Sequence, residues 1–192
     1  MQFIKACDFI LEKLKKELPS NLYYHTVEHV NDVCNAAREI GKAEGIDKYN
    51  MRLLETAVLF HDAGFLTGPN NHEEKSCMIS KQYLPCYNYS EDEIEKICGM
   101  IMATRIPQSP KNHLEEIICD ADLDYLGRDD FYDTGSKLFR EFIEFGVVST
   151  EKDWNNLQVR FLEQHHFFTN TAIKSRQGKK MEHLYLLKQK IG

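Results

Sequence analysis

Apolar residues recur every three or four positions along nearly the whole chain, which is the period of a helix packed on one face. The pattern predicts helices over the following ranges: 3–18, 26–44, 51–63, from 72 onward, 90–104, 111–126, 129–145, 150–172 and 176–190. No pair of strands and no internal repeat stands out. The chain is therefore expected to be all-α, a single-domain bundle of about eight or nine helices.

Length and charge limit the classes of protein to consider. The chain has 192 residues, of which 42% are hydrophobic, enough for one domain with a sizeable core. We expect residues 1–192 to form that domain, with residues 129–192 completing the bundle. The net charge is -6, and Lys and Arg are scattered among acids, so nucleic acid is not an expected partner. One pocket can still be positive enough for a small anion.

The sequence also predicts a cytoplasmic location. No stretch approaches the roughly 20 apolar residues that span a membrane, and the first residues mix charges unlike a secretory signal. The six cysteines show no C-x-x-C spacing, and most lie beside apolar residues in helical pattern. They are expected to be free thiols in a reducing compartment.

Capping signals mark several expected helix ends. Ser90 with Glu93, and Asn71 with Glu74, have the spacing of a capping box. Asn50 is the expected cap of the helix over 51–63. The segment GFLTGPNN that follows this helix is the clearest loop of the chain, because it holds two glycines and a proline.

His61 and Asp62 end the most apolar helix of the chain, in the string LFHDAGF. An Asp there is expected to be buried, and a buried carboxylate without a partner is strongly destabilising. The nearest basic residue upstream is Arg52, more than one helical turn away. A divalent metal ion satisfies the carboxylate and a neutral imidazole together, so this pair predicts a metal site.

Two further segments carry groups that suit such a site. His25 and His29, in YYHTVEHV, are four residues apart and share a helix face, so either can reach a common site. They also fit core or surface histidines that donate to backbone carbonyls. In DADLDYLG, residues two apart point about 200° apart on a helix, so not all three acids face one site. Asp122 is expected on the packed face, and Asp120 and Asp124 in solvent-facing or capping roles.

Taken in order, the strings YYHTVEHV, LFHDAGF and DADLDYLG resemble the signature of the HD-domain superfamily of metal-dependent phosphohydrolases, over roughly residues 20–128. The resemblance implies an orthogonal helical bundle and four protein ligands, which are His29, His61, Asp62 and Asp122. Two imidazoles and two carboxylates suit one ion of Mn²⁺, Mg²⁺, Fe²⁺, Co²⁺, Ni²⁺ or Zn²⁺. The absence of thiolate ligands argues against a closed structural zinc site.

The implied reaction is hydrolysis of a phosphate ester by a metal-activated water, which Asp62 also orients. The Y-H-x-x-x-H string resembles the cyclic-nucleotide phosphodiesterase branch, in which the first histidine is the proton donor. His25 is therefore the expected donor, or alternatively a residue that orients His29. His72 is expected to contact substrate phosphate or a second metal, or to be a solvated first-turn residue. Arg105 is a candidate phosphate clamp or a surface residue.

Departures from the family patterns narrow the function. HD proteins with two metals resemble one another in two extra histidines, and this chain offers only His72 before MIMATRIP. A second metal and a diiron oxygenase are therefore disfavoured. The acidic pair of guanosine-tetraphosphate hydrolases is also missing. The expected function is hydrolysis of a nucleotide or another small phosphate ester, and the alternative is a regulatory module that binds a nucleotide without turnover.

The remaining histidines are expected to be structural: His113, His165, His166 and His183.

Overall fold

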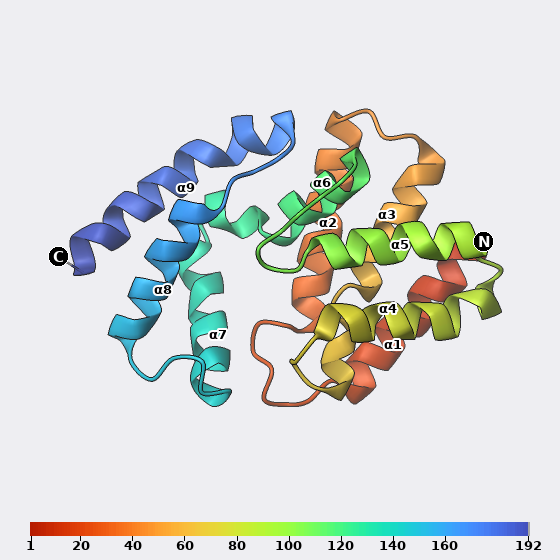
Figure 1. Ribbon diagram of the computed structural model, residues 1–192, viewed down its shortest axis with the longest axis horizontal. Helices are drawn as coiled ribbons and strands as arrows, with labels where there is room; N and C mark the ends of the chain where they lie inside the picture. The colour runs from red at the N-terminus through yellow and green to blue at the C-terminus, as the bar shows by residue number, and fades with distance from the viewer. Residues whose placement is uncertain (192) are drawn as a thin grey trace.

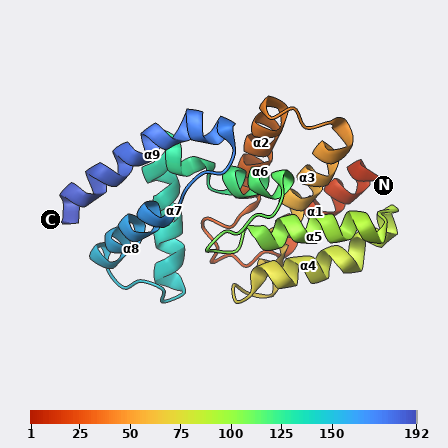
Figure 2. The ribbon, with the colours of Figure 1, turned by 45° about the horizontal axis from the view of Figure 1, so that its top comes forward.

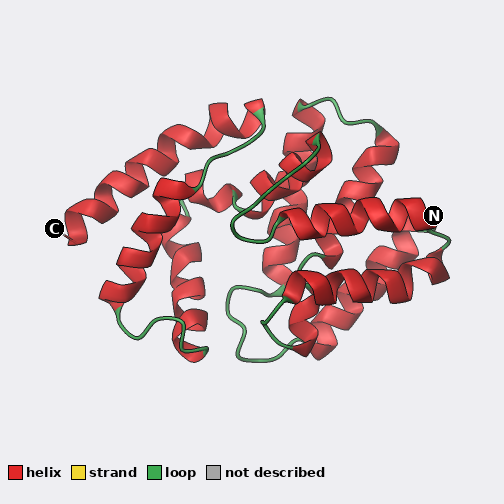
Figure 3. Cartoon of the chain, viewed as in Figure 1, coloured by secondary structure: helices red, strands yellow, loops and turns green. Residues whose placement is uncertain are grey.

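Each α-helix overlaps a range that the helical period of apolar residues predicted, although several boundaries differ, most of all near the C-terminus. We describe residues 1–191 of a computed structural model, which hold nine α-helices, three short 3-10 helices and no strand (Figure 3). The helices are α1 (Phe3–Glu17), α2 (Val27–Ala43), α3 (Lys48–Phe60), η1 (Ala63–Thr67), α4 (His72–Tyr83), η2 (Leu84–Tyr87), α5 (Glu91–Ala103), α6 (His113–Asp122), η3 (Asp124–Gly127), α7 (Phe131–Glu144), α8 (Glu151–Gln164) and α9 (Asn170–Ile191). The all-α prediction is confirmed.

Helix α3 lies at the centre of the first six α-helices. Its residues from Leu53 to Phe60 are all buried, because α1, α2, α5 and α6 pack around it. Helices α7, α8 and α9 lie on the far side of α2 and α6, and the two views in Figures 1 and 2 agree on this arrangement. Over residues 1–191, no helix combines the length and the apolar character that a membrane span requires.

Two of the three predicted caps differ from the structure. Asp47, rather than Asn50, caps α3, because its side chain accepts the backbone N–H of Tyr49 at 2.8 Å and of Asn50 at 2.9 Å. Asn71 adopts a left-handed φ of 52° and makes no side-chain cap on α4. The capping box of Ser90 and Glu93 on α5 is confirmed. The first half of the segment predicted as a loop, residues 64–67, lies in the 3-10 helix η1, and residues 68–71 form a turn before α4.

The predicted helix over 150–172 is wrong, because the chain leaves α8 at Gln164 and starts α9 at Asn170. Asp120 causes this break. Its carboxylate accepts the backbone N–H of Phe168 at 2.9 Å and the N–H and hydroxyl of Thr169, both at 2.7 Å. These bonds hold the segment outside helical hydrogen bonding, and the Thr169 hydroxyl then accepts the N–H of Ala172 at the start of α9.

The expectation that Asp120 and Asp124 face solvent is therefore wrong for both residues. Asp120 is fully buried, and Asp124 is buried against the guanidinium of Arg176, whose Nε donates to it at 2.7 Å. The C-terminal helices cover this side of α6, and periodicity within α6 alone does not show that. Gly127 permits the close contact, because a Cβ there would overlap the backbone of Arg176.

The histidines expected to be structural make local contacts. His183 bonds the carbonyl of Arg128 at 2.8 Å and stacks on Phe131. His113 pairs with Glu116 on the surface of α6. The His166 ring packs edge-on against Phe168. All six cysteines are free thiols.

Replacing Asp120 with alanine is expected to lower the free energy of unfolding by about 2–4 kcal/mol, because it leaves buried N–H groups of residues 168 and 169 without acceptors. Urea unfolding followed by circular dichroism measures this change. Asp129→Ala is the matched control, since Asp129 is almost fully exposed and is expected to change stability by less than about 0.5 kcal/mol. Equal effects of the two variants would contradict the anchoring role of Asp120.

His165 is expected to make the fold acid-sensitive. Burial, with Lys180 beside it, lowers the pKa of His165 from 6.5 to about 3. Between these two values the unfolded chain binds a proton that the folded chain does not, so stability falls as pH drops below about 6.5. The loss from this residue is expected to reach at most about 2 kcal/mol at pH 5.

Replacing His165 with glutamine removes the titrating group and keeps an amide near the Lys180 ammonium, which donates to the His165 carbonyl and contacts its ring. Unfolding in urea at pH 7 and at pH 5 measures the difference. A variant that loses as much stability as the wild type over this interval would show that His165 is not the sensitive group.

A candidate metal centre

The pair His61–Asp62 is held at the end of α3 by the first turns of α4. His61 is the C-cap of α3 and Asp62 precedes η1. The buried hydroxyl of Ser76 donates to the carbonyl of His61 at 2.6 Å and accepts the N–H of Gly64 at 2.8 Å. A Cβ at Gly64 would overlap the carbonyl oxygen of His72, so glycine is needed where α4 begins against this turn.

Helices α2 and α6 bring two more side chains to the pair. His29 lies in the first turn of α2, and Asp122 is the last residue of α6. One ligand atom each from His29, His61 and Asp122 lie within 4.8 Å of one another. Oδ2 of Asp62 is 3.4 Å from Nε2 of His29 and 3.2 Å from Nε2 of His61. The four residues predicted as ligands are thus brought together in one cluster.

The hydrogen bonds of the cluster show which atoms lack a partner. The Nδ1–H of His61 donates to the carbonyl of Val58 at 2.7 Å, which directs Nε2 toward the carboxylates of Asp62 and Asp122. Nε2 of His29, Nε2 of His61 and Oδ2 of Asp62 are all buried and make no hydrogen bond. Imidazole lone pairs facing carboxylate oxygens repel one another unless positive charge lies between them. The donor set therefore fits a divalent cation.

The ionisation of these groups indicates the same demand for positive charge. Burial acts to lower the pKa of His29 and of His61, but the close carboxylates of Asp62 and Asp122 outweigh it, so both pKa values are raised. Burial acts to raise the pKa of each carboxyl group, and the imidazoles instead hold both pKa values below the ordinary range. A cluster that stabilises cationic imidazoles in this way would stabilise a metal dication by the same field.

His25 lies next to the cluster, on the segment that leads into α2. Its ring stacks on Phe65 of η1 with centroids 4.1 Å apart, and its centroid is 5.9 Å from that of His29. Nδ1 of His25 hydrogen-bonds Oε1 of Glu141. The other oxygen of Glu141 accepts the backbone N–H of Tyr23 at 2.8 Å and of Tyr24 at 2.9 Å. Glu141 therefore fixes both the backbone and the ring of His25.

Glu141 is the main site residue that the sequence reasoning missed. It lies in α7 and is almost fully buried, yet it is more than a hundred positions from His25. The local signal was an acid within the apolar pattern of FREFIEF, where a solvated glutamate is unusual. Only the packing of α7 against the start of α2 shows what this carboxylate binds.

His72 and Arg105 take different positions relative to the cluster. Nε2 of His72 is 3.6 Å from Oδ1 of Asp62 and 3.5 Å from the buried carboxylate of Glu73. Arg105 lies one step further away, because its guanidinium contacts Glu73 at 3.3 Å and also pairs with Glu74. Arg105 is therefore bound by two carboxylates of α4, those of Glu73 and Glu74, and not by the residues of the cluster.

Solved structures with the same helix arrangement come from several bacteria. The chain is similar to a predicted HD superfamily hydrolase from an uncultured Thermotogales bacterium, with a TM-score of 0.62, 20% identity, and 97% of this chain and 89% of that chain covered. It is also similar to Bacillus subtilis YpgQ in complex with ADP, with a TM-score of 0.66, 19% identity, and 98% and 95% covered. A Lactobacillus plantarum protein gives a TM-score of 0.69 at 16% identity.

The chain has the HD-domain fold. Within this fold, the histidine, the adjacent His–Asp pair and the last aspartate of the resemblance lie together in one buried cluster. No family model matches the chain. An uncharacterized protein of Clostridium beijerinckii is 32% identical over 105 residues, and the match spans 53% of this chain and 66% of that relative's length.

We expect a divalent ion to stabilise the HD fold through this cluster. Mn²⁺ at about a hundred times its dissociation constant is expected to stabilise the wild type by about 2.7 kcal/mol, because the unfolded chain does not hold the four ligands together. Thermal unfolding with and without Mn²⁺ measures the shift. Asp62→Ala is expected to lose it, whereas the control Asp32→Ala, which changes an aspartate of α2 paired with Arg128, is expected to keep it. A shift of equal size in the Asp62 variant would place the ion elsewhere.

Proposed function

We propose that the chain is a metal-dependent phosphohydrolase of the HD superfamily that acts on a nucleotide or another small phosphate ester. The observation that carries the proposal is the buried cluster of His29, His61, Asp62 and Asp122, in which three inward-facing atoms have no hydrogen-bond partner. We propose these four residues as the ligands of one divalent ion. A group of converging donors of this kind is seldom retained unless it binds something.

The proposed ion supplies Lewis-acid polarisation of a phosphoryl oxygen and a water of lowered pKa. Asp62 contributes a second function through its other oxygen. Oδ2 faces the two imidazoles, whereas Oδ1 faces His72 across 3.6 Å, on the side away from them. We propose that Oδ1 accepts a hydrogen bond from the attacking water and orients it toward phosphorus.

We propose His25 as the proton donor to the leaving oxygen. Because Nδ1 is occupied by Glu141, the ring presents Nε2 to a substrate. Burial acts to raise the pKa of Glu141, but hydrogen bonds from the His25 ring and from backbone N–H groups hold the pKa below its ordinary value. An ionised Glu141 accepts the Nδ1–H of His25 and so leaves Nε2 as the nitrogen that would donate.

The space beside His25 supports a nucleotide-sized substrate. A cleft of about 390 Å³ borders this residue. Its other lining residues are mainly apolar, with one ammonium and one carboxylate among them: Leu14, Lys15, Leu18, Pro19, Leu22, Thr26, Val27 and Glu28. An apolar cleft next to the proton donor suits the part of the ester that leaves with the oxygen. The structural neighbour YpgQ was solved in complex with ADP, which supports a nucleotide as the class of substrate.

The first test measures metal content and then hydrolysis of a panel of nucleotides and small phosphate esters with added Mn²⁺, Mg²⁺, Co²⁺ or Ni²⁺. We expect turnover that requires the metal and that Asp62→Ala abolishes, while Asp32→Ala retains it. Metal and nucleotide bound without turnover of any ester would favour a regulatory module instead. Two irons per chain would favour an oxygenase.

The second test separates proton donation from metal chemistry. His25→Ala is expected to lower kcat by about 10²–10⁴-fold for esters with an alkoxide leaving group, because such an oxygen must be protonated as it departs. For a p-nitrophenyl ester the loss is expected to be much smaller, since that leaving group departs without a proton. Glu141→Gln is expected to show the same dependence on leaving group with a smaller loss.

Metal content, measured for each of these variants, serves as the control. His25 is not among the four proposed ligands, so His25→Ala is expected to retain the metal. An equal loss of activity on all esters, with the metal retained, would argue against His25 as the donor and would leave the metal proposal intact.

A further inference from the structure

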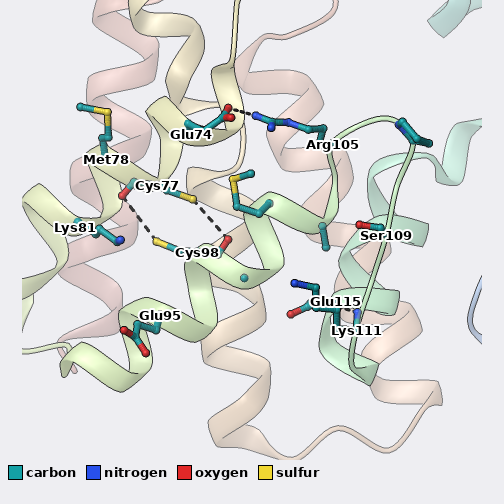
Figure 4. A pocket seen from close by; sticks show the side chains of 14 residues that line it. Glu74, Cys77, Met78, Lys81, Glu95, Cys98, Arg105, Ser109, Lys111 and Glu115 are labelled. Atoms are coloured by element: carbon teal, nitrogen blue, oxygen red, sulfur yellow. Dashed lines mark hydrogen bonds and ion pairs between the residues drawn. The ribbon is translucent and has the colours of Figure 1, made fainter.

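A second cavity has none of the four proposed metal ligands in its lining. It has a volume of about 710 Å³ and lies between α4, α5 and the chain from residue 105 to 111 (Figure 4). Its lining includes two thiols, Cys77 of α4 and Cys98 of α5, and the thioether of Met102. Neither the proposed metal site nor the proposed proton donor uses any of these three residues.

The two thiols lie against each other where α4 packs on α5. Sγ of Cys77 is 3.5 Å from the carbonyl oxygen of Cys98, and Sγ of Cys98 is 3.8 Å from the carbonyl oxygen of Cys77. Figure 4 shows the side chains lying side by side and pointing in opposite directions. Each residue is about nine-tenths buried, and the exposed part of each lines the cavity. A reagent therefore reaches this pair through the cavity.

The surroundings make the two sulfurs unequal. The side chain of Cys77 and the nearby ammonium of Lys81 lower the pKa of Cys98, although burial and the carboxylate of Glu95 oppose this shift. The neighbouring Cys98 side chain and burial raise the pKa of Cys77. Thiolate, rather than thiol, is the nucleophilic form of cysteine. Cys98 is thus suited to make the first attack on a disulfide, and Cys77 is suited to attack the Cys98 sulfur in a second step.

Two ammonium groups border the cavity without partners. Neither Lys81 nor Lys111 forms an ion pair with a carboxylate within residues 1–191, whereas Arg105 is paired with Glu73 and Glu74. Two of the lining acids, Glu95 and Glu115, also form no ion pair within residues 1–191. Glu115 accepts the side-chain N–H of Asn112 and the backbone N–H of Lys111, and Glu95 lies three residues before Cys98 on α5. Lys81 and Lys111 supply the ammonium groups that would bind the carboxylates of a small ligand.

We propose that Cys98 and Cys77 form a redox-active dithiol that reacts with a small, carboxylate-bearing disulfide bound in this cavity. The Cys98 thiolate attacks one sulfur of the disulfide, the small S–S bond breaks, and the departing thiolate takes up a proton. Cys77 then loses its proton and attacks the Cys98 sulfur, which releases the second small thiol. The two protein thiols are oxidised to one disulfide, and the small disulfide is reduced to two thiols.

The resulting Cys77–Cys98 disulfide joins α4 to α5, and α4 also carries residues at the candidate metal centre. Cys77 lies four residues after Glu73, on the same face of α4, and the first turn of this helix also carries His72. A bond at Cys77 therefore constrains the helix that presents His72 to Asp62.

The test incubates the native full-length chain with oxidised glutathione. A Cys86→Ser background removes the exposed thiol, which would react without a site. Intact mass spectrometry is expected to show a loss of two hydrogens, and peptide mapping a Cys77–Cys98 link. In the Cys77→Ser variant the reaction is expected to stop at a glutathione adduct on Cys98. The Cys98→Ser variant is expected to give neither product.

Matched lysine variants test the binding part of the proposal. Replacing Lys81 and Lys111 with alanine is expected to slow the reaction with oxidised glutathione several-fold but to leave the reaction with neutral hydroxyethyl disulfide nearly unchanged. Lys96→Ala is the control, because Lys96 belongs to α5 and does not line the cavity. Circular dichroism checks that each variant is folded.

Two results would overturn the proposal. If Cys77 and Cys98 stay unmodified in the native chain, while both react once urea unfolds it, the pair is not a redox-active dithiol. If the double lysine variant reacts with oxidised glutathione as fast as the Lys96→Ala control, the cavity does not bind a carboxylate-bearing disulfide. Neither result depends on hydrolysis of a phosphate ester, so both are independent of the proposed function.

Discussion

One buried and one partly buried carboxylate, those of Asp62 and Asp122, face two buried imidazoles where α2, α6 and the end of α3 meet. The Nδ1–H of His61 donates a hydrogen bond to the carbonyl of Val58, so only Nε2 remains to face Asp62 and Asp122. Such a group is stable when positive charge lies within it. Contacts of Gly64 and Ser76 hold α4 against residues 61–64 and so keep the side chains of His61 and Asp62 in position.

Buried carboxylates also decide how distant parts of the chain fit together. Asp120 accepts N–H groups from the segment between α8 and α9, and Glu141 accepts N–H groups from the segment before α2. In both cases one side chain replaces the hydrogen bonds that a non-helical segment lacks. The C-terminal helices therefore do more than cover the bundle. Through Glu141, α7 positions the histidine that we propose as the proton donor.

Local sequence signals succeeded where the deciding contacts were local. The capping box at Ser90 formed because both partners lie within one helical turn. The cap predicted at Asn50 failed because Asp47, three residues earlier, offers an acceptor at the true start of α3. The break after Gln164 had no local signal, since the residue that produces it, Asp120, lies on another helix. The solvent-facing role expected for Asp120 and Asp124 failed for the same reason.

The sequence by itself determined the helical class, because the period of its apolar residues admits no sheet, and it marked the His61–Asp62 pair, because an acid at the end of so apolar a helix needs a positive partner. The order of the motif added His29 and Asp122 by resemblance. Tertiary structure alone decided that Glu141 holds His25, that Arg105 is engaged by Glu73 and Glu74, and that Cys77 meets Cys98. Each of these contacts joins separate segments of the chain, and periodicity along one helix contains no information about which other segment will cover it.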